Sequence, residues 1–241
     1  MGRAFEYRKA RKMKRWAGMA KAFTKVGREI NIAIKEGGPD PDYNPRLRLA
    51  IANAKAVNMP KANVDAAIKR ATDKDSANYD EVTFEGYGPH GIAILVQATT
   101  DNNNRTVANI RHVFSKYGGS MGVNGSVDYM FERKGQFRVK KDNFKHDLEE
   151  IELELIDAGL DSLVVEDEEI VFYTAFEDFG SFQHELEERG IAVDNAELIY
   201  LPNHTKTLSD TEAEAVIKLI DMLEEDDDVA NVFHTMDESE E

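Results

Sequence analysis

Hydrophobic positions recur with two different periods along the chain. Over residues 19–71 they return every three or four residues, which is the spacing of one face of a helix. From Asp80 onward, alternating stretches typical of strands appear between helical ones. The pattern therefore predicts an α+β protein in which a helical N-terminal domain precedes two α+β domains.

The segment 19–35 has the clearest helical pattern. At roughly 100° per residue, its apolar positions gather on one side of the helix and its basic positions on the opposite side. Gly37, Gly38 and Pro39 predict the end of this helix. The apolar stripe consists of Phe23, Val26, Ile30 and Ile34, and the basic stripe of Lys21, Lys25, Arg28 and Lys35.

Two shorter helices are predicted within residues 44–71. Asn44 is a suitable N-cap, and Pro45 fits the first turn, where a missing N–H costs nothing. Pro60 separates the helices, because the residue before proline avoids the α region. The inward positions are Leu47, Ile51, Ala54 and Asn58 in the first helix and Val64, Ala67, Ile68 and Ala71 in the second. The outward positions are basic, namely Arg46, Arg48, Lys55, Lys61, Lys69 and Arg70, with one acid, Asp65.

Beyond a polar linker at 72–79, the pattern predicts one α+β domain inserted into another. Ser209 and Glu212 form the capping box of a late helix. The outer domain has strands at 81–87, 92–99, 126–131 and 229–234 and helices at 101–117 and 209–225. The inserted ferredoxin-like βαββαβ unit has strands at 136–139, 162–166, 169–174 and 196–201 and helices at 144–158 and 179–189. The predicted domains are 1–78, 79–132 plus 205–241, and 133–204.

Charge is distributed very unevenly between the ends of the chain. Residues 1–78 carry 18 Lys and Arg against 8 Asp and Glu, whereas residues 79–241 carry 12 against 38. A basic segment beside an acidic remainder is typical of proteins that bind nucleic acid. The alternative is that the basic residues only solvate small helices. Residues 1–18 are expected to form an arm that orders on a phosphate backbone, with Trp16 stacking on a base or anchoring the arm.

Several classes of site are excluded by composition. The chain contains no cysteine, so disulfides, zinc knuckles and thiol nucleophiles are excluded. Its six histidines are never closer than 20 residues, which predicts no metal site, and no cofactor is expected. No apolar run is long enough for a membrane span and the N-terminus lacks the apolar core of a signal peptide, so a cytoplasmic protein is expected.

Three polar motifs permit two interpretations each. Residues 86–91 match GxGxxG, but a strand follows them where a nucleotide-binding loop needs a helix, so a hairpin turn is predicted. The glycine-rich loop 118–125 is a connector or a binding loop. In the helix that starts after Asn102, Arg105 and Lys116 form a secondary phosphate site, or the asparagines are structural caps.

The sequence also resembles a known family. The similarity is carried by FTKVGREI at 23–30, by NPRLRLAIANAKAVNMPKANVDAAIKRA at 44–71, and by YDEVTFEGYGPHGIAILVQATTDNNNRTVANIRHVFSKYGGSMGVNGSV at 79–127. These segments are similar to the YebC family, whose members are usually described as transcriptional regulators and which includes the mitochondrial translational activator of cytochrome c oxidase. The resemblance implies a helical domain, two α+β domains and a cytoplasmic, cofactor-free nucleic-acid-binding protein. The family's usual GHSKWxxIKHRK-type start is replaced here by MGRAFEYRKARKMKRW.

Together these features predict a non-enzymatic regulator of gene expression that binds nucleic acid through residues 1–71. No helix-turn-helix, zinc finger or RNP motif is present, so the target is DNA, or alternatively structured RNA or the ribosome in translation. A protein partner is expected on the acidic α+β domains. Two alternatives stay open: an enzyme acting on nucleic acid through Asp101, Glu85 or His112, and an adaptor whose basic helices bind an acidic protein. The predicted nucleic-acid-binding residues are Lys21, Lys25, Arg28, Arg46, Arg48, Lys55, Lys61, Lys69 and Arg70.

Overall fold

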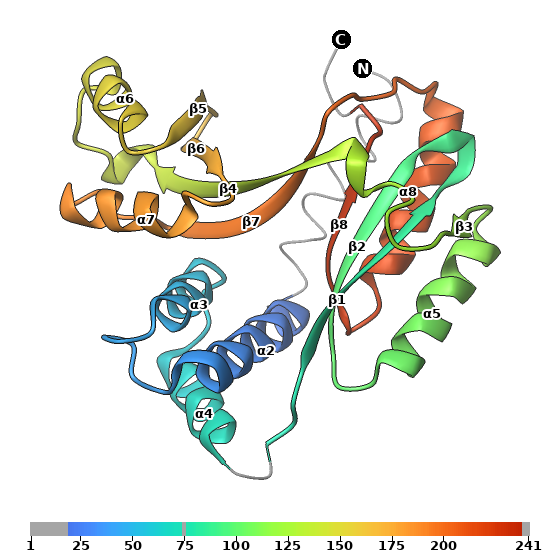
Figure 1. Cartoon of the computed structure of the whole chain (residues 1–241), viewed down its shortest axis with the longest axis horizontal. Helices are drawn as coiled ribbons and strands as arrows, with labels where there is room; N and C mark the ends of the chain where they lie inside the picture. Colours follow the sequence, from blue (N-terminus) through green and yellow to red (C-terminus); the bar gives the residue numbers. More distant parts are fainter. Residues whose placement is uncertain (1–18, 74–75, 238–241) are drawn as a thin grey trace. The chain divides into compact units, whose positions relative to one another are not determined.

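The computed structural model describes residues 19–73 and 76–237, which divide into two compact units (Figure 1). Among the described residues, the first unit comprises 19–28, 77–132 and 202–237, and the second comprises 29–73, 76 and 133–201. The basic arm, with Trp16, and the end of the acidic tail lie outside the described residues. The separate domains 1–78, 79–132 plus 205–241, and 133–204 remain a prediction.

The first unit is an antiparallel sheet with two helices packed on it. Its strand order is β3-β1-β2-β8, with β1 and β2 joined by the hairpin that contains the GxGxxG match. Helices α5 and α8 cover the sheet (Figure 1) and enclose a core that includes Phe84, Ile94 and Phe114. The strands are β1 (Asp80–Tyr87), β2 (Ala93–Thr100), β3 (Ser120–Met121) and β8 (Val229–His234). The helices are α5 (Asn103–Lys116) and α8 (Asp210–Glu224), with 3-10 turns at Pro89–Gly91 and Asp128–Met130.

The second unit contains a four-stranded sheet of order β5-β6-β4-β7 and three N-terminal helices, the first of which begins in the first unit. This strand order is that of a ferredoxin-like βαββαβ unit, which confirms the predicted fold class. Its strands are β4 (Phe131–Lys140), β5 (Leu160–Val165), β6 (Glu169–Ala175) and β7 (Asn195–Pro202). The helices are α2 (Met19–Gly37), α3 (Pro45–Ala56), α4 (Lys61–Thr72), α6 (Leu148–Ile156) and α7 (Phe179–Glu188), and a 3-10 turn spans Lys141–Asn143.

Local signals placed most elements correctly. The Asn44 side chain accepts a hydrogen bond from the Leu47 N–H at 3.0 Å, and Ser209 and Glu212 form the expected capping box. The buried positions of α2 include Val26, Ile30 and Ile34, as the apolar stripe predicted. The GxGxxG match at 86–91 is a hairpin turn, because β1 and β2 pair in antiparallel register on either side of it.

Three predictions about local structure are wrong. The strand expected at 126–131 is absent, and β4 starts only at Phe131, because the N–H groups of Val127 and Asp128 donate to the Glu85 carboxylate. The helix expected at 144–158 is shorter, because the Asp147 side chain caps it. Asn58 does not face inward: it is exposed with φ of 56°.

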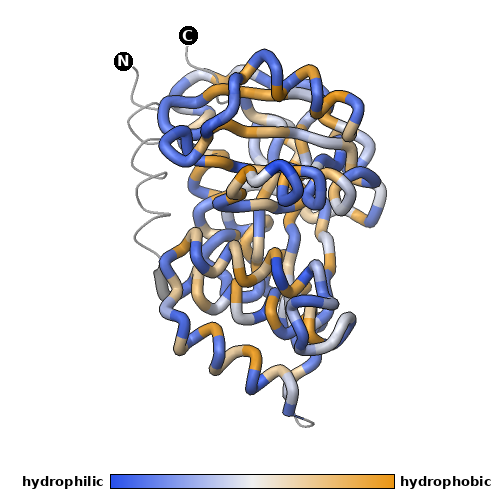
Figure 2. The backbone as a smooth tube through the Cα atoms, turned by 90° about the vertical axis from the view of Figure 1, so that its left-hand side faces the viewer, coloured by the Kyte–Doolittle hydropathy of each residue, from blue (hydrophilic) through white to orange (hydrophobic). Residues whose placement is uncertain are grey.

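Hydrophobic residues are distributed in short clusters along the backbone (Figure 2). This distribution follows from helices and strands that bury one face each. No helix of the described residues is long and apolar enough to cross a membrane.

Candidate nucleic-acid interface

Helices α3 and α4 present four exposed cations. Lys55 lies near the end of α3, and Lys61, Lys69 and Arg70 lie on α4. Asn44 caps the start of α3. On α4, Val64, Ala67 and Ala71 are buried on one face, so the charged side chains of this helix lie on the exposed side. Within the described residues the three lysines have no side-chain hydrogen bond or ion pair, and Arg70 donates only to the Ala66 carbonyl of its own helix, at 3.2 Å. Nothing in these contacts prevents the four cations from binding phosphate.

Arg46 and Arg48 have partners within the helical region. Arg46 pairs with Glu36 at 2.6 Å. Arg48 donates to the carbonyls of Pro41 and Asp42 at 2.8 and 3.2 Å, and these residues belong to the loop between α2 and α3. Both arginines therefore stabilise that connection, and a phosphate would compete with these contacts.

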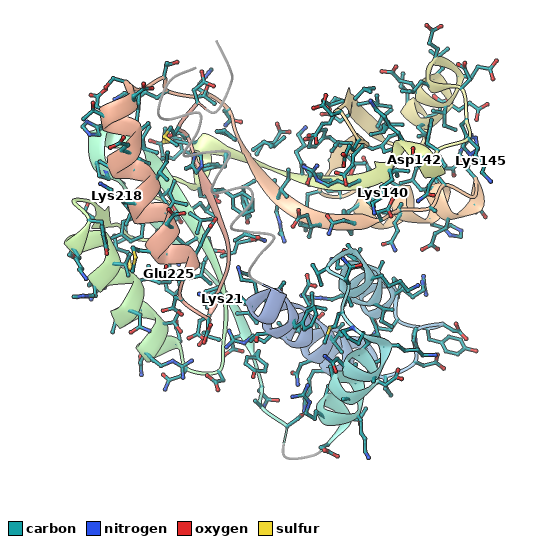
Figure 3. All side chains as sticks on the ribbon, turned by 180° about the vertical axis from the view of Figure 1, so that it is seen from behind. Lys21, Lys140, Asp142, Lys145, Lys218 and Glu225 are labelled. Atoms are coloured by element: carbon teal, nitrogen blue, oxygen red, sulfur yellow. The ribbon has the colours of Figure 1, made fainter. Side chains whose placement is uncertain are left out.

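Two lysines of the basic stripe of α2 contact the first unit, to which they belong, whereas Lys35 is exposed. Lys21 Nζ donates to the Glu225 carbonyl at 2.5 Å, and Lys25 Nζ to the Ala230 carbonyl at 2.9 Å. Figure 3 shows Lys21 beside Glu225, just after the end of α8. Helical periodicity predicted an outward stripe for these lysines, because it shows which residues share a face but not what covers that face.

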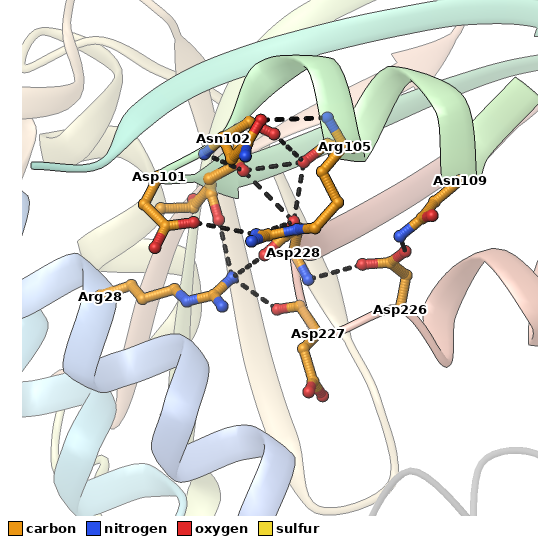
Figure 4. A network of polar contacts seen from close by, with 11 residues as sticks. Arg28, Asp101, Asn102, Arg105, Asn109, Asp226, Asp227 and Asp228 are labelled. Atoms are coloured by element: carbon orange, nitrogen blue, oxygen red, sulfur yellow. Dashed lines mark hydrogen bonds and ion pairs between the residues drawn. The ribbon is translucent and has the colours of Figure 1, made fainter. Parts of the chain in front are cut away.

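Arg28 enters a buried polar network centred on Asp228 (Figure 4). Its Nη1 lies 3.1 Å from Asp228 Oδ1 and donates to the Thr99 and Asp227 carbonyls at 2.7 and 2.6 Å. Asp228 Oδ2 accepts from Arg105 Nη2 and from the Thr106 hydroxyl, both at 2.7 Å. The network joins the start of α5, the turn between α8 and β8, and the middle of α2 within one unit.

Asp228 is only 3% exposed, yet it is well suited to remain ionised. Burial by itself raises the pKa of this carboxyl, but hydrogen bonds from Arg105 and Thr106 and the charges of Arg105 and Arg28 lower the pKa below its usual value. The sequence pattern did not single out Asp228, which lies at the end of the acidic run 224–228. The only sequence signal was that Arg28 lies on a basic stripe and Arg105 in the first turn of a helix.

The two residues of the predicted secondary phosphate site are not brought together. Arg105 pairs with Asp101 at 2.9 Å as well as with Asp228. Lys116 lies above the ring of Tyr117, 5.5 Å from its centroid. They lie eleven positions apart on α5, or roughly 16 Å at a rise of about 1.5 Å per residue. A phosphate at Arg105 would have to displace two carboxylates, and this site remains a prediction.

The glycine-rich loop 118–125 is packed tightly against β1. Glu85 of β1 is 6% exposed and accepts hydrogen bonds from the N–H groups of Gly125, Val127 and Asp128 at 2.6, 2.7 and 2.8 Å. A Cβ at Gly119 would lie 2.6 Å from the Tyr87 carbonyl oxygen, so only glycine fits there. The glycines therefore permit close packing of the loop, a role that the motif alone did not indicate.

Two of the three residues of the enzyme alternative, Glu85 and Asp101, have structural partners. Burial raises the pKa of Glu85, but the backbone N–H donors outweigh it and lower the pKa below its usual value, whereas a general base near neutral pH needs a raised one. Asp101 pairs with Arg105, and His112 is exposed on α5. Among the described residues, no group of three or more His, Asp and Glu is arranged to hold a metal ion.

Comparison with known proteins decides the family. Residues 3–74 match the family model of the TACO1/YebC protein N-terminal domain, and residues 79–236 match that of the TACO1/YebC second and third domain. The chain belongs to the TACO1/YebC family. The resemblance predicted from its motifs is thereby confirmed.

Relatives within the TACO1/YebC family match over almost their whole length. A protein of Flavobacterium johnsoniae is 55% identical, and the match covers 99% of this chain and 100% of that protein. A protein of Porphyromonas gingivalis is 54% identical, and the match covers 100% of this chain and 99% of that protein. Both are named probable transcriptional regulatory protein. The crystal structure of a conserved hypothetical protein from Aquifex aeolicus is 40% identical, covers 92% of this chain and 91% of its own, and superposes with a TM-score of 0.80. These likenesses support the TACO1/YebC architecture described above.

Proposed function

We propose that this protein is a non-enzymatic regulator of gene expression that binds nucleic acid in the cytoplasm through α3 and α4. The observation that carries the proposal is the set of four exposed cations on these helices, Lys55, Lys61, Lys69 and Arg70, in the one basic segment of an otherwise acidic chain. Phosphate neutralisation by such residues provides most of the affinity of nucleic-acid-binding proteins. The names of the relatives support a regulatory role.

The other five predicted contacts have a secondary role in this proposal. Arg46 and Arg48 can exchange their loop contacts for phosphate at modest cost, because both are partly exposed. Lys21, Lys25 and Arg28 would have to leave carbonyl or carboxylate partners in the first unit. The primary interface therefore consists of the four exposed cations, and the three residues of α2 stabilise the fold.

Two targets, DNA in transcription and structured RNA or the ribosome in translation, are compatible with this interface. The outward face of α4 carries Lys61, Lys69 and Arg70 but only one side chain, Asn63, of the amide type that reads adenine. Contacts to phosphate fix orientation and carry no sequence information. This composition favours a target recognised by shape, such as folded RNA, over a specific operator.

Crosslinking in cells, with sequencing of the attached nucleic acid, tests the proposal. We expect crosslinks to RNA or DNA that fall sharply when Lys55, Lys61, Lys69 and Arg70 are all replaced by alanine. A matched control replaces four exposed cations elsewhere by alanine, namely Arg111, Lys140, Lys145 and Lys218 (the three lysines are labelled in Figure 3). Equal loss in the control would show that net charge alone governs binding, and unchanged crosslinking in the first variant would contradict the assigned interface.

Two further measurements address the alternatives. Labelled RNA and DNA incubated with the protein and with magnesium should stay intact, since the proposal assigns no catalytic group. The second measurement asks which protein partners remain bound after nuclease treatment. If such partners are lost when Lys55, Lys61, Lys69 and Arg70 are alanine, the protein is an adaptor whose basic helices bind an acidic protein. A protein partner on the acidic α+β domains is a separate expectation.

A further inference from the structure

The sheet of the second unit ends in β5, whose outer edge pairs with no other strand among the described residues. The Glu166 N–H donates to the Glu169 carbonyl at 2.9 Å, which sets the phase of the β5–β6 ladder. Because every second residue of an antiparallel strand bonds to its neighbour, Val164 bonds to β6 and the N–H groups of Leu163 and Val165 point away from the sheet. The backbone of β5 thus offers unpaired donors to an additional strand.

Apolar side chains border this free edge. Val164 and Val165 of β5 are 46% and 50% exposed, and on α6 Leu153 and Ile156 are 70% and 55% exposed. Helix α6 packs against β5, as Figure 1 shows. Glu154 pairs with Arg189 at the end of α7, and Ile156 lies roughly 200° further round α6, on the side away from α7. Ile156 and Val165 are therefore on the side of the unit where the sheet ends.

Acidic residues surround these apolar positions. Residues 147–169 carry eleven Asp and Glu and neither Lys nor Arg. Charges along an edge strand oppose pairing with a like-charged strand. A second copy of this chain would bring the same acids to the edge and be repelled, whereas a cationic strand would be attracted. The charge therefore selects the partner that the free edge can accept.

We propose that the outer edge of β5, together with Leu153 and Ile156, is a docking surface for an extended, lysine- or arginine-rich segment of a partner protein, which adds a strand to the sheet. Main-chain hydrogen bonds to Leu163 and Val165 provide affinity in this mode of recognition, and alternate side chains of the added strand provide specificity. Apolar side chains of the segment cover Val165 and Ile156, and basic ones meet the surrounding carboxylates. This surface is independent of the proposed nucleic-acid interface, because its charge repels a polyanion.

The test uses the full chain and a fluorescent peptide of alternating lysine and valine, KVKVKVK, with anisotropy as the readout. Two control peptides are used. The first keeps the valines and has glutamate in place of each lysine. The second has the same residues as KVKVKVK arranged in blocks, KKKKVVV. We expect saturable binding of the alternating basic peptide. The affinity of both controls should be lower by a factor of roughly ten or more. No binding of KVKVKVK, or equal binding of the block peptide, would overturn the proposal.

Two variants locate the peptide on the protein. Val165→Pro removes an outward N–H without breaking a β5–β6 hydrogen bond and should weaken binding roughly tenfold, whereas Val165→Thr, which keeps the N–H and loses only one methyl contact, should weaken it much less. If Val165→Pro does not fold, Leu153→Gln with Ile156→Gln, both on the exposed side of α6, should weaken binding instead. Unchanged binding in the folded variants would place the peptide elsewhere and refute the assignment. Dimerisation of the wild type that is lost in Val165→Pro would show that the edge serves a second copy, which also refutes it.

Discussion

At the scale of single residues, the most consequential side chains are buried carboxylates that stay charged. Asp228 is held by Arg28, Arg105 and Thr106, and Glu85 by three backbone N–H groups. A buried charge is tolerated only when such partners replace water. Both residues are therefore predicted to contribute to stability rather than to chemistry.

Replacing Asp228 with asparagine should lower the free energy of unfolding by about 2–3 kcal/mol at neutral pH, because the Arg28 guanidinium loses its buried counter-charge. Asp227→Asn is the control, since its side chain is exposed and its carbonyl contact to Arg28 is kept; it should change stability by no more than about 0.5 kcal/mol. Urea denaturation measures both. Equal stability of the two variants would contradict the role of Asp228.

The same variant has a predicted pH dependence. The pKa of Asp228 is lowered in the folded protein, so its stabilising contribution is present above the ordinary value of 3.8 and is lost as the pH falls through the lower folded pKa. The difference in unfolding free energy between the wild type and Asp228→Asn should be constant from neutral pH down to this region and shrink below it. A difference that instead grew on acidification would show that the carboxyl is protonated in the folded state.

Glu85→Gln should release the loop that follows β3. An amide has one acceptor oxygen where the carboxylate has two, so at least one of the N–H groups of Gly125, Val127 and Asp128 loses its partner. We expect a loss of about 1–3 kcal/mol in unfolding free energy and faster hydrogen exchange at these three amides. Exchange that is faster throughout the molecule, with no excess at the loop, would show that Glu85 does not hold it locally.

At the scale of elements, Asn53 joins α3 to β7 within the second unit. Its Nδ2 donates to the Ala196 carbonyl at 3.0 Å, and its Oδ1 accepts from the Ala196 N–H at 3.2 Å. The side chain thus satisfies both backbone groups of a residue that is fully buried. The helical pattern alone did not indicate this contact, because Asn53 lies among the small apolar residues of α3.

Asn53→Ala should destabilise the protein by about 2–3 kcal/mol, because the Ala196 N–H and C=O remain buried without a partner. Asn63→Ala on the exposed face of α4 is the control and should change stability by no more than about 0.5 kcal/mol. Thermal and urea unfolding of the full chain compare the two. Similar small effects would mean that water or a neighbouring group replaces Asn53 without cost.

At the scale of the whole molecule, the basic segment is not an independent part of the fold. Helix α2 belongs to both compact units, with the division after Arg28. A fragment cut near residue 78 would remove the partners of Lys21, Lys25 and Arg28. Charge substitutions in the full chain are therefore a better test of nucleic-acid binding than isolated domains.

A salt titration in the full chain measures the contribution of the four exposed cations. If Lys55, Lys61, Lys69 and Arg70 each contact a phosphate, the slope of log K against log salt should become less steep by about 3.6 on duplex DNA and about 2.8 on single strands when all four are alanine. The control set Arg111, Lys140, Lys145 and Lys218 should leave the slope unchanged. A preference of about a thousandfold for one promoter over random DNA and ribosomal RNA fragments would instead indicate a dedicated operator-binding protein.

Most of the elements and the fold class of this protein could be predicted from the amino-acid sequence. Periodicity located α2 and its apolar stripe, Asn44 and Ser209 marked helix starts, and the βαββαβ order predicted the ferredoxin-like sheet. These features depend on interactions between residues close in the chain, or on strand order, which the sequence displays directly. The asymmetry of charge likewise identified the basic segment in advance.

Which cations are available to a ligand depends on tertiary contacts. Helical periodicity placed both sets of cations outward. Lys21, Lys25 and Arg28 nevertheless meet carbonyls and Asp228 about 200 residues away in sequence, whereas Lys61, Lys69 and Arg70 remain exposed. The same holds for Glu85, whose donors come from a loop 40 residues later, and for the free edge of β5. Contacts between distant segments depend on how the folded elements pack, and the local pattern of residues carries no record of them.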